Sequence, residues 1–184
     1  SDTLAWRRGG EIKRSFSRYA EERSRGLVEV LKFDLVISNE FHQLIKRMTQ
    51  AIARGDGAAA AECFTLDGVY HDAFYGEFAG PAAIVGMVAN YFHGNAKDLM
   101  WTVHHVIADG DLGYASYDFA YTSKMAGSEG RRVSFSGMSR CVLRGELIAR
   151  YDEIFERGLA LVQLDFAEPR IMKSLRRWAQ PEGR

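Results

Sequence analysis

The sequence contains few cysteines, few prolines and no excess charge. Its 184 residues include two cysteines and three prolines, and 24 basic side chains balance 24 acidic ones. A neutral balance argues against an electrostatic nucleic-acid binder, which normally carries a basic excess. No apolar run approaches the roughly 20 residues that a bilayer span requires, and the opening SDTLAWRRGG lacks the apolar core of a signal peptide. We therefore expect neither nucleic acid nor membrane as a partner.

The residue types that bind metals are also sparse and badly spaced for that purpose. Cys63 and Cys141 each lie in an apolar run without metal or redox spacing, which predicts buried free thiols and a cytoplasmic protein. His104 and His105 are adjacent in a predicted strand, so their side chains point to opposite faces and cannot chelate one ion together. We expect no metal and no cofactor.

The length suits one domain with room for an internal cavity. We divide the chain into an N-terminal extension, residues 1–38, and a domain, residues 39–184. In the extension, Ile12, Phe16 and Tyr19 have helical spacing, whereas the apolar run 27–37 fits a helix or a strand.

The first half of the domain has helical periodicity. One helix is predicted from residue 39, with its apolar face formed by Phe41, Leu44, Ile45, Met48 and Ile52. Gly55 ends this helix and Asp56 caps a short Ala-rich one. A short strand, Val69 to Asp72, a glycine-bounded loop and a helix that opens at Pro81 follow. Met48 and Met87 are predicted to lie in the core.

From Leu99 onward the period changes to two. Glycine-containing turns at 110–111, 127–130 and 145–146 separate four predicted strands: MWTVHHVIAD, LGYASYDFAYTS, RRVSFSGMSRCVL and ELIARYDEIF. A closing helix is predicted over residues 166–178. Antiparallel strands after a helical half indicate the α+β class.

Strand alternation predicts which side chains face the interior. In the first strand the inward set is Trp101, Val103, His105 and Ile107. In the last strand Glu153 alternates with apolar residues, so desolvation should disfavour its charged form.

The two central strands are less decisive. In the second strand either Tyr117, Phe119 and Tyr121 or the face with Asp118 fits the interior. In the third, Val133, Phe135, Gly137, Ser139 and Cys141 share a face. A glycine in mid-strand, here Gly137, indicates a bulge or a close approach by a neighbour.

The order of VYHDAF, GEFAG, HHVIADGD, RRVSFSGMSR and ELIARYDEIFE over residues 39 to about 165 resembles the NTF2-like superfamily, which includes SnoaL-like, ketosteroid-isomerase-like and limonene-epoxide-hydrolase-like proteins. The resemblance implies an NTF2-like cone, in which N-terminal helices wrap a curved, mostly antiparallel sheet around a ligand cavity. It also implies a homodimer that forms through the sheet.

In a comparison with ketosteroid isomerases, Asp72 occupies the position of the general base. The donors of that site fall at Met48 and near Ser139, which argues against steroid isomerisation.

Relative to limonene-epoxide-hydrolase-like enzymes, Asp118 and Glu153 stand at the two acids and Ser116 at the arginine. Relative to scytalone dehydratase, His105 stands at the catalytic histidine, while its partner aspartate falls near Ala53.

These observations predict a cofactor-free enzyme that uses general acid–base chemistry on a small apolar molecule, of cyclase, isomerase, dehydratase or epoxide hydrolase type. The predicted catalytic residues are Asp72, His105, Asp118 and Glu153, and the predicted binding residues are Tyr70, Trp101, Ser139 and Tyr151. The alternative is a non-catalytic ligand-binding or assembly protein.

Overall fold

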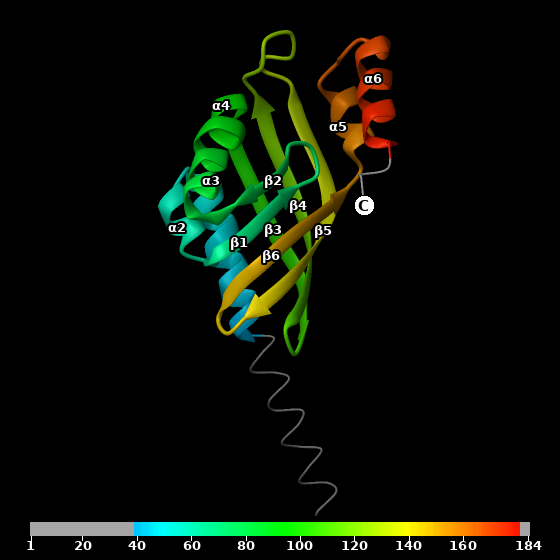
Figure 1. The fold of residues 1–184 in the computed structure, drawn as a ribbon. Coiled ribbons are helices and arrows are strands. Elements are labelled where there is room, and N and C mark those ends of the chain that lie inside the picture. The colour runs from blue at the N-terminus through cyan, green and yellow to red at the C-terminus, as the bar shows by residue number, and fades with distance from the viewer. Residues whose placement is uncertain (1–38, 181–184) are drawn as a thin grey trace, which may run out of the picture. The chain divides into compact units, whose positions relative to one another are not determined.

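The computed structural model describes residues 39–180, which form a curved sheet with helices packed against it (Figure 1). The six strands are β1 Phe64–Asp72, β2 Gly76–Ala79, β3 Ala96–Asp109, β4 Leu112–Ser123, β5 Arg132–Arg144 and β6 Leu147–Phe155. Their order is β2-β1-β6-β5-β4-β3, and only β1 and β6 pair in parallel. The predicted α+β class with a mostly antiparallel sheet is confirmed. The predicted extension, residues 1–38, lies outside the described residues.

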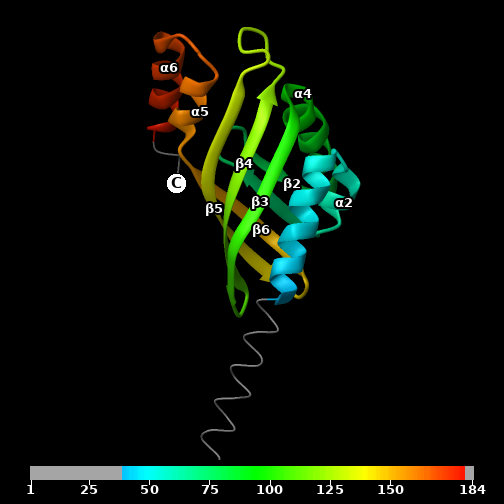
Figure 2. The same ribbon diagram turned by 180° about the vertical axis from the view of Figure 1, so that it is seen from behind.

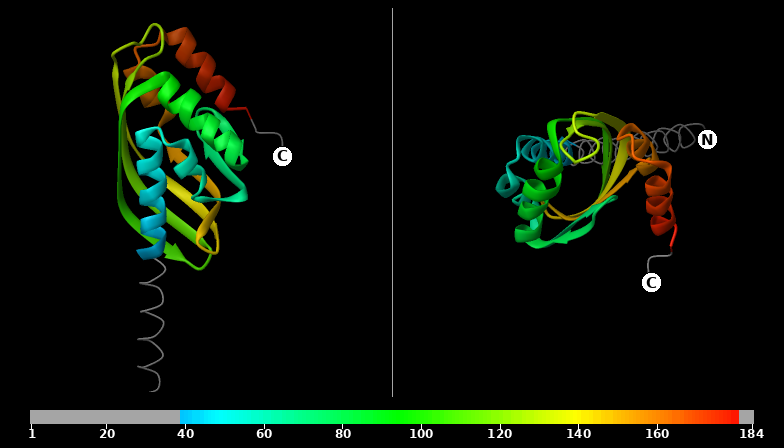
Figure 3. Two further views of the ribbon diagram at one scale, coloured as in Figure 1. Left: turned by 90° about the vertical axis from the view of Figure 1, so that its left-hand side faces the viewer. Right: turned by 90° about the horizontal axis from the view of Figure 1, so that it is seen from above.

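The helices form two groups, one from the segments before β3 and one from the segment after β6. A helix over residues 39–54, α2 Gly57–Ala61, α3 Gly80–Met87, the π-helical turn η1 Val88–Phe92 and α4 His93–Asn95 gather on one side (Figures 1 and 2). Seen from above, the sheet bends and these helices lie along its open side (Figure 3). The helices α5 Arg157–Gln163 and α6 Glu168–Trp178 follow β6. Among residues 39–180 no helix is both long and apolar enough to cross a membrane.

The helix over residues 39–54 forms as its periodicity predicts. Its apolar face is buried, and so is Met87 on α3, which confirms the predicted core positions. The helix ends before Gly55, whose φ of 80° suits glycine. Asp56 then caps α2 by accepting a hydrogen bond from the backbone N–H of Ala59 at 3.0 Å.

Two short segments differ from the prediction. The first strand is longer than expected, and residues 76–79 form strand β2 instead of a loop, because Val69 to Asp72 pair with Ala79 to Gly76. The helix that opens at Pro81 changes to a π-helical turn at Val88. The predicted closing helix is found as α6, while α5 was not predicted.

The helix α5 covers the part of β5 that extends past the end of β6. The pairing of β5 with β6 stops at Gly137 and Phe155. Beyond that point the Gln163 side chain accepts from the N–H of Ser134 at 2.7 Å and donates to its carbonyl at 2.9 Å. These bonds satisfy an exposed sheet edge. Behind them a small core of Val133, Ala160 and Leu164 packs against Phe135 and Tyr121.

The strand β3 contains a bulge that overturns one prediction. Val103 pairs with Tyr117 and Val106 with Ala115, so two β3 residues oppose the single β4 residue between them. The extra residue reverses the alternation. Ile107 is therefore 65% exposed instead of inward. The expectation that His105 faces the interior is wrong for the same reason.

Candidate functional site

The parallel pairing of β1 with β6 brings two acidic residues together. Tyr70 pairs with Tyr151 and His71 with Asp152, so Asp72 and Glu153 follow as the next pair along the two strands. Both side chains point to the concave face and are buried, with 4% and 8% of their surface exposed. Two carboxyl groups far apart in the sequence thus share one wall of the sheet.

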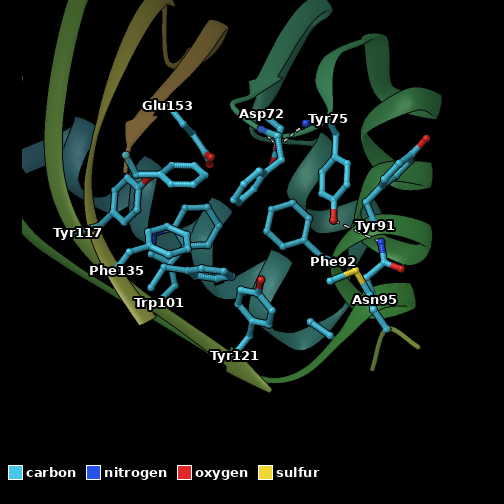
Figure 4. A pocket seen from close by; sticks show the side chains of 15 residues that line it. Asp72, Tyr75, Tyr91, Phe92, Asn95, Trp101, Tyr117, Tyr121, Phe135 and Glu153 are labelled. Atoms are coloured by element: carbon cyan, nitrogen blue, oxygen red, sulfur yellow. Dashed lines mark hydrogen bonds between the residues drawn. The ribbon is translucent and has the colours of Figure 1, made fainter. Parts of the chain in front are cut away.

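This wall borders an aromatic cavity with a free volume of about 50 Å³. Figure 4 shows Asp72 and Glu153 projecting from one side, with Trp101 and Tyr121 across from them. None of the Lys, Arg or His residues between positions 39 and 180 lines it. Its lining consists of Asp72, Phe74, Tyr75, Tyr91, Phe92, Asn95, Ala96, Trp101, Tyr117, Phe119, Tyr121, Met125, Phe135, Glu153 and Phe155. Aromatic rings therefore supply most of the surface that a ligand would meet.

Asp72 is held by the turn that follows β1. One carboxylate oxygen, Oδ1, accepts hydrogen bonds from the backbone N–H groups of Phe74 at 2.7 Å and Tyr75 at 2.9 Å. Burial raises the pKa of Asp72, while these two hydrogen bonds and the charge of His71 oppose the rise. Among residues 39–180 no protein donor binds the second oxygen, Oδ2, so it is available to a ligand.

Glu153 has a different environment. Burial raises the pKa of Glu153 well above its ordinary value, and the negative charge of Asp72 raises it further. The Tyr70 hydroxyl donates a hydrogen bond to Oε1 of Glu153, which opposes the rise without cancelling it. The arrangement therefore favours the protonated form at Glu153 more than at Asp72, whose carboxylate accepts two backbone hydrogen bonds. One site thereby holds a proton donor and a proton acceptor.

Of the four predicted binding residues, one lines the cavity and three lie behind its lining. Trp101 lines the cavity, and its indole N–H is buried with no acceptor among the described residues. Tyr70, Tyr151 and Ser139 are buried behind the lining. The Tyr70 and Tyr151 rings pack with their centroids 4.7 Å apart, and the Ser139 hydroxyl points to the Ala115 carbonyl at 3.5 Å. These three side chains support the wall instead of facing the cavity.

Two of the four predicted catalytic residues lie on the opposite face of the sheet. Asp118 is exposed, accepts from Ser136 at 2.6 Å and pairs with His104 at 2.7 Å. These hydrogen bonds lower its pKa. His105 is exposed beside Ser116, with 3.4 Å between its Nδ1 and the hydroxyl oxygen. The expectation that both residues share a cavity with Asp72 and Glu153 is therefore wrong.

The cavity also contains residues from turns and helices that strand alternation did not predict. Phe74 and Tyr75 belong to the turn after β1, and Tyr91 and Asn95 lie on η1 and α4. The Asn95 amide donates to the Tyr75 hydroxyl at 3.3 Å and joins two of these segments. The sequence does contain one signal for these residues: Asp72 is followed directly by a turn that carries two aromatic side chains. Among residues 39–180 no three His, Cys, Asp or Glu residues are placed to hold a metal ion.

A sequence comparison identifies the family. The model of the SnoaL-like domain matches residues 45–151, which is more than half of the chain. The chain belongs to the SnoaL-like domain family. The matched range contains the helix over residues 39–54 from Ile45 onward, strands β1 to β5 and most of β6. It includes Asp72 but ends before Glu153. No match was found among functionally curated proteins.

Solved structures agree with this SnoaL-like assignment at the level of the fold. A ketosteroid-isomerase-like protein from Catenulispora acidiphila, in complex with trimethylamine, has a TM-score of 0.60 at 19% identity and covers 67% of this chain and 96% of its own. A limonene-epoxide-hydrolase-like epoxide hydrolase from M. tuberculosis has a TM-score of 0.57 at 15% identity, with 75% and 96% covered. An NTF2-like protein of unknown function from Burkholderia pseudomallei has a TM-score of 0.59 at 10% identity, with 69% and 98% covered. The predicted NTF2-like fold is confirmed.

Proposed function

We propose that this SnoaL-like protein is an enzyme that moves a proton next to a carbonyl group of a small, mainly apolar molecule. The observation that carries the proposal is the pair of carboxyl groups, Asp72 and Glu153, which line one aromatic cavity in unlike hydrogen-bonding environments. The substrate class follows from the lining, which is aromatic or aliphatic apart from these acids and Asn95.

The proposed step uses both groups at once. The free Oδ2 of Asp72 takes a proton from the carbon beside the carbonyl, and the electron pair of that C–H bond forms a carbon–carbon double bond. The carbonyl π electrons take a proton from the Glu153 carboxyl group and give an enol. Asp72 ends protonated and Glu153 ends ionised, and the reverse transfers restore both. A proton donor that stabilises the developing oxyanion supplies most of the rate enhancement at such a site.

Trp101 supports the same proposal from the facing wall. Its buried indole N–H has no acceptor among the described residues, although a buried donor without a partner is costly. A ligand oxygen in the cavity supplies that acceptor. We assign Trp101 to substrate binding, and Tyr70 to positioning Glu153.

Exchange of substrate hydrogen with deuterated water tests the chemistry without knowledge of the natural substrate. Small ketones such as butanone and cyclopentanone are incubated with the protein in D₂O, and proton NMR follows the loss of their α-hydrogens. We expect catalysed exchange that falls by about 100-fold or more in Asp72→Asn and in Glu153→Gln, the range typical of general acid–base groups. Asp118→Asn, on the opposite face, should exchange at the wild-type rate. Equal exchange in all four proteins would refute the proposed roles.

A non-catalytic ligand-binding protein is the second candidate. The position of Asp118 and His105 on the opposite face of the sheet favours it, because two of the four predicted catalytic residues are then absent from the cavity lining among residues 39–180. Binding of ketones without any catalysed exchange would support this candidate over the enzyme.

We also propose that the protein is a homodimer. Five large apolar side chains are exposed on the outer face of the sheet, opposite the cavity: Met100, Ile107, Tyr114, Met138 and Ile154. Met138 and Ile154 face each other across β5 and β6, and Ile154 is 70% exposed. Several large apolar side chains exposed on one face are typical of protein interfaces.

A further inference from the structure

A second, larger pocket opens beside the aromatic cavity. Its free volume is about 500 Å³, and it lies between the turn after β1, the end of β6, the start of α5 and the end of α6. It shares five lining residues with the cavity: Asp72, Phe74, Tyr75, Glu153 and Phe155. Both hollows therefore border the same two carboxyl groups. We call the larger one the outer pocket.

In the part of the chain that the structure describes, two arginines line the outer pocket and none lines the inner cavity. The guanidinium carbons of Arg157 and Arg177 lie 4.5 Å and 5.8 Å from the centre of the Trp178 ring. Arg157 also donates to the Ala73 carbonyl at 2.9 Å, which fixes its position. Within residues 39–180 neither guanidinium forms an ion pair with a carboxylate. Two positive groups thus meet at one indole without a negative partner.

Trp178 connects this charged region to the inner cavity. Its ring packs against Phe74, with 5.7 Å between the ring centres, and Phe74 lines both hollows. A molecule that extends from the carboxyl groups past Phe74 therefore enters the outer pocket, which Arg157 and Arg177 line.

The free volumes of the two hollows indicate which part of such a molecule each one can hold. The inner cavity holds only a short apolar end, because its free volume is about one tenth of the outer pocket's, about 50 against about 500 Å³. The remainder of a substrate must occupy the outer pocket. There the guanidinium groups offer charge-assisted donors that match a carboxylate or a phosphate.

We propose that the ligand is an amphipathic acid, whose short apolar end enters the aromatic cavity and whose anionic group binds Arg157 and Arg177. This substrate class rests on the proposed function for its reacting end, while the anion site depends only on the arginines. The carboxylate and the phosphate share the chemistry that the two guanidinium groups recognise.

Three probes of equal chain length test the proposal: hexanoate, hexyl phosphate and the neutral hexanol. Binding is followed by the indole NMR signals of Trp101 and Trp178, which Trp101→Phe and Trp178→Phe assign among the signals of the three tryptophans. At low salt we expect one or both anions to bind about tenfold or more tightly than hexanol, a difference of about 1.4 kcal/mol. The preferred anion identifies whether the site takes a carboxylate or a phosphate.

Substitutions of single arginines test which side chain causes the tighter binding of the anions. Arg177→Gln should remove most of the advantage of the anion and leave the affinity for hexanol unchanged. Arg157→Gln should act in the same direction, but it also removes the bond to Ala73, so Arg177→Gln is the cleaner variant. Arg176→Gln is the matched control, because Arg176 is an exposed neighbour on α6 that does not line the outer pocket.

Three results would overturn the anion site: equal binding of all three probes, no binding of any probe, or an anion preference that survives Arg177→Gln. None of them depends on turnover. Loss of the proposed chemistry would show instead as ketone exchange that is insensitive to Asp72→Asn and Glu153→Gln.

Discussion

The Tyr70 hydroxyl donates a hydrogen bond to the Glu153 carboxyl group, and both side chains are buried in the wall of the aromatic cavity. The two residues are 83 positions apart in the sequence and meet because β1 pairs in parallel with β6. The bond occupies one carboxyl oxygen of Glu153 and orients the other. Burial in turn raises the pKa of Tyr70, so the phenol keeps its proton and remains a donor.

The raised pKa of Glu153 predicts a characteristic dependence of stability on pH. In the unfolded chain the carboxyl group loses its proton near pH 4.5, whereas in the folded protein it retains the proton to higher pH. The folded state then binds more protons, so the free energy of unfolding falls as pH rises from about 4.5 towards the folded pKa. Each tenfold difference in proton affinity is worth about 1.4 kcal/mol.

Glu153→Gln should therefore become more stable relative to the wild type as pH increases from 5 to 8, because glutamine cannot ionise and still accepts from Tyr70. Urea unfolding at several pH values measures the difference. Asp118→Asn serves as the control. The lowered pKa of Asp118 contributes stability that is lost only as pH falls through the acidic range, so its curve should parallel the wild type over pH 5 to 8. Parallel curves for Glu153→Gln and wild type would show that Glu153 is not a neutral acid.

Replacing Tyr70 with Phe should destabilise the protein by about 1–3 kcal/mol, because a buried carboxyl group loses its donor. The loss should grow with pH, since a hydrogen bond to an ionised carboxylate is the stronger one. Tyr75→Phe is the matched control. The Tyr75 hydroxyl accepts a long bond from Asn95 and its side chain is partly exposed, so we expect a loss of under about 1 kcal/mol. Equal losses in the two variants would contradict a special role for the Tyr70 bond.

The sequence was sufficient for what depends on local periodicity. The apolar face of the helix over residues 39–54, the four long strands and the apolar row around Glu153 all follow from spacing of 3.6 or two residues. The close approach at Gly137 was also predictable, since glycine in mid-strand indicates a neighbour that needs its space.

The site itself was only half predictable, because two long-range features decide it. One extra residue in β3 turns His105 outward, and alternation carries no sign of such a bulge. The parallel register of β1 and β6 sets Asp72 beside Glu153, and strands 80 residues apart reveal no register in their sequences. Asp118 illustrates the remaining ambiguity: both faces of its strand carry tyrosines, so the pattern could not select the inner one.

The proposed homodimer predicts that negative charge on the outer face of the sheet yields monomers. In Met138→Glu/Ile154→Glu two carboxylates replace exposed apolar side chains that face each other across β5 and β6. Burying them in an interface would cost several kcal/mol, and the dimer should dissociate. Sedimentation velocity at micromolar concentration measures the mass. Val162→Glu changes an equally exposed apolar residue on α5 and should remain dimeric. A monomeric wild type would rule out this interface.

Gly137 predicts how tightly the cavity wall is packed. A methyl group at this position would lie 2.5 Å from the ring carbon Cζ and the hydroxyl of Tyr117, so the Tyr117 ring must move in Gly137→Ala. Overpacking of this kind costs about 1–3 kcal/mol. Tyr117 lines the cavity, so the shifted ring should also weaken the binding of any ligand there.

A double-mutant cycle separates this clash from a simple loss of strand stability. If the Tyr117 ring is the obstacle, Gly137→Ala should cost little in a Tyr117→Leu background, and the two changes should couple by about 1 kcal/mol or more. Gly86→Ala is the control, because the nearest atom to its added methyl group is an Asn90 side-chain nitrogen at 3.8 Å, and alanine there should stabilise α3 by about 0.4–1 kcal/mol. Additive losses at Gly137 and Tyr117 would mean that the glycine serves the backbone of β5 and not the shape of the cavity.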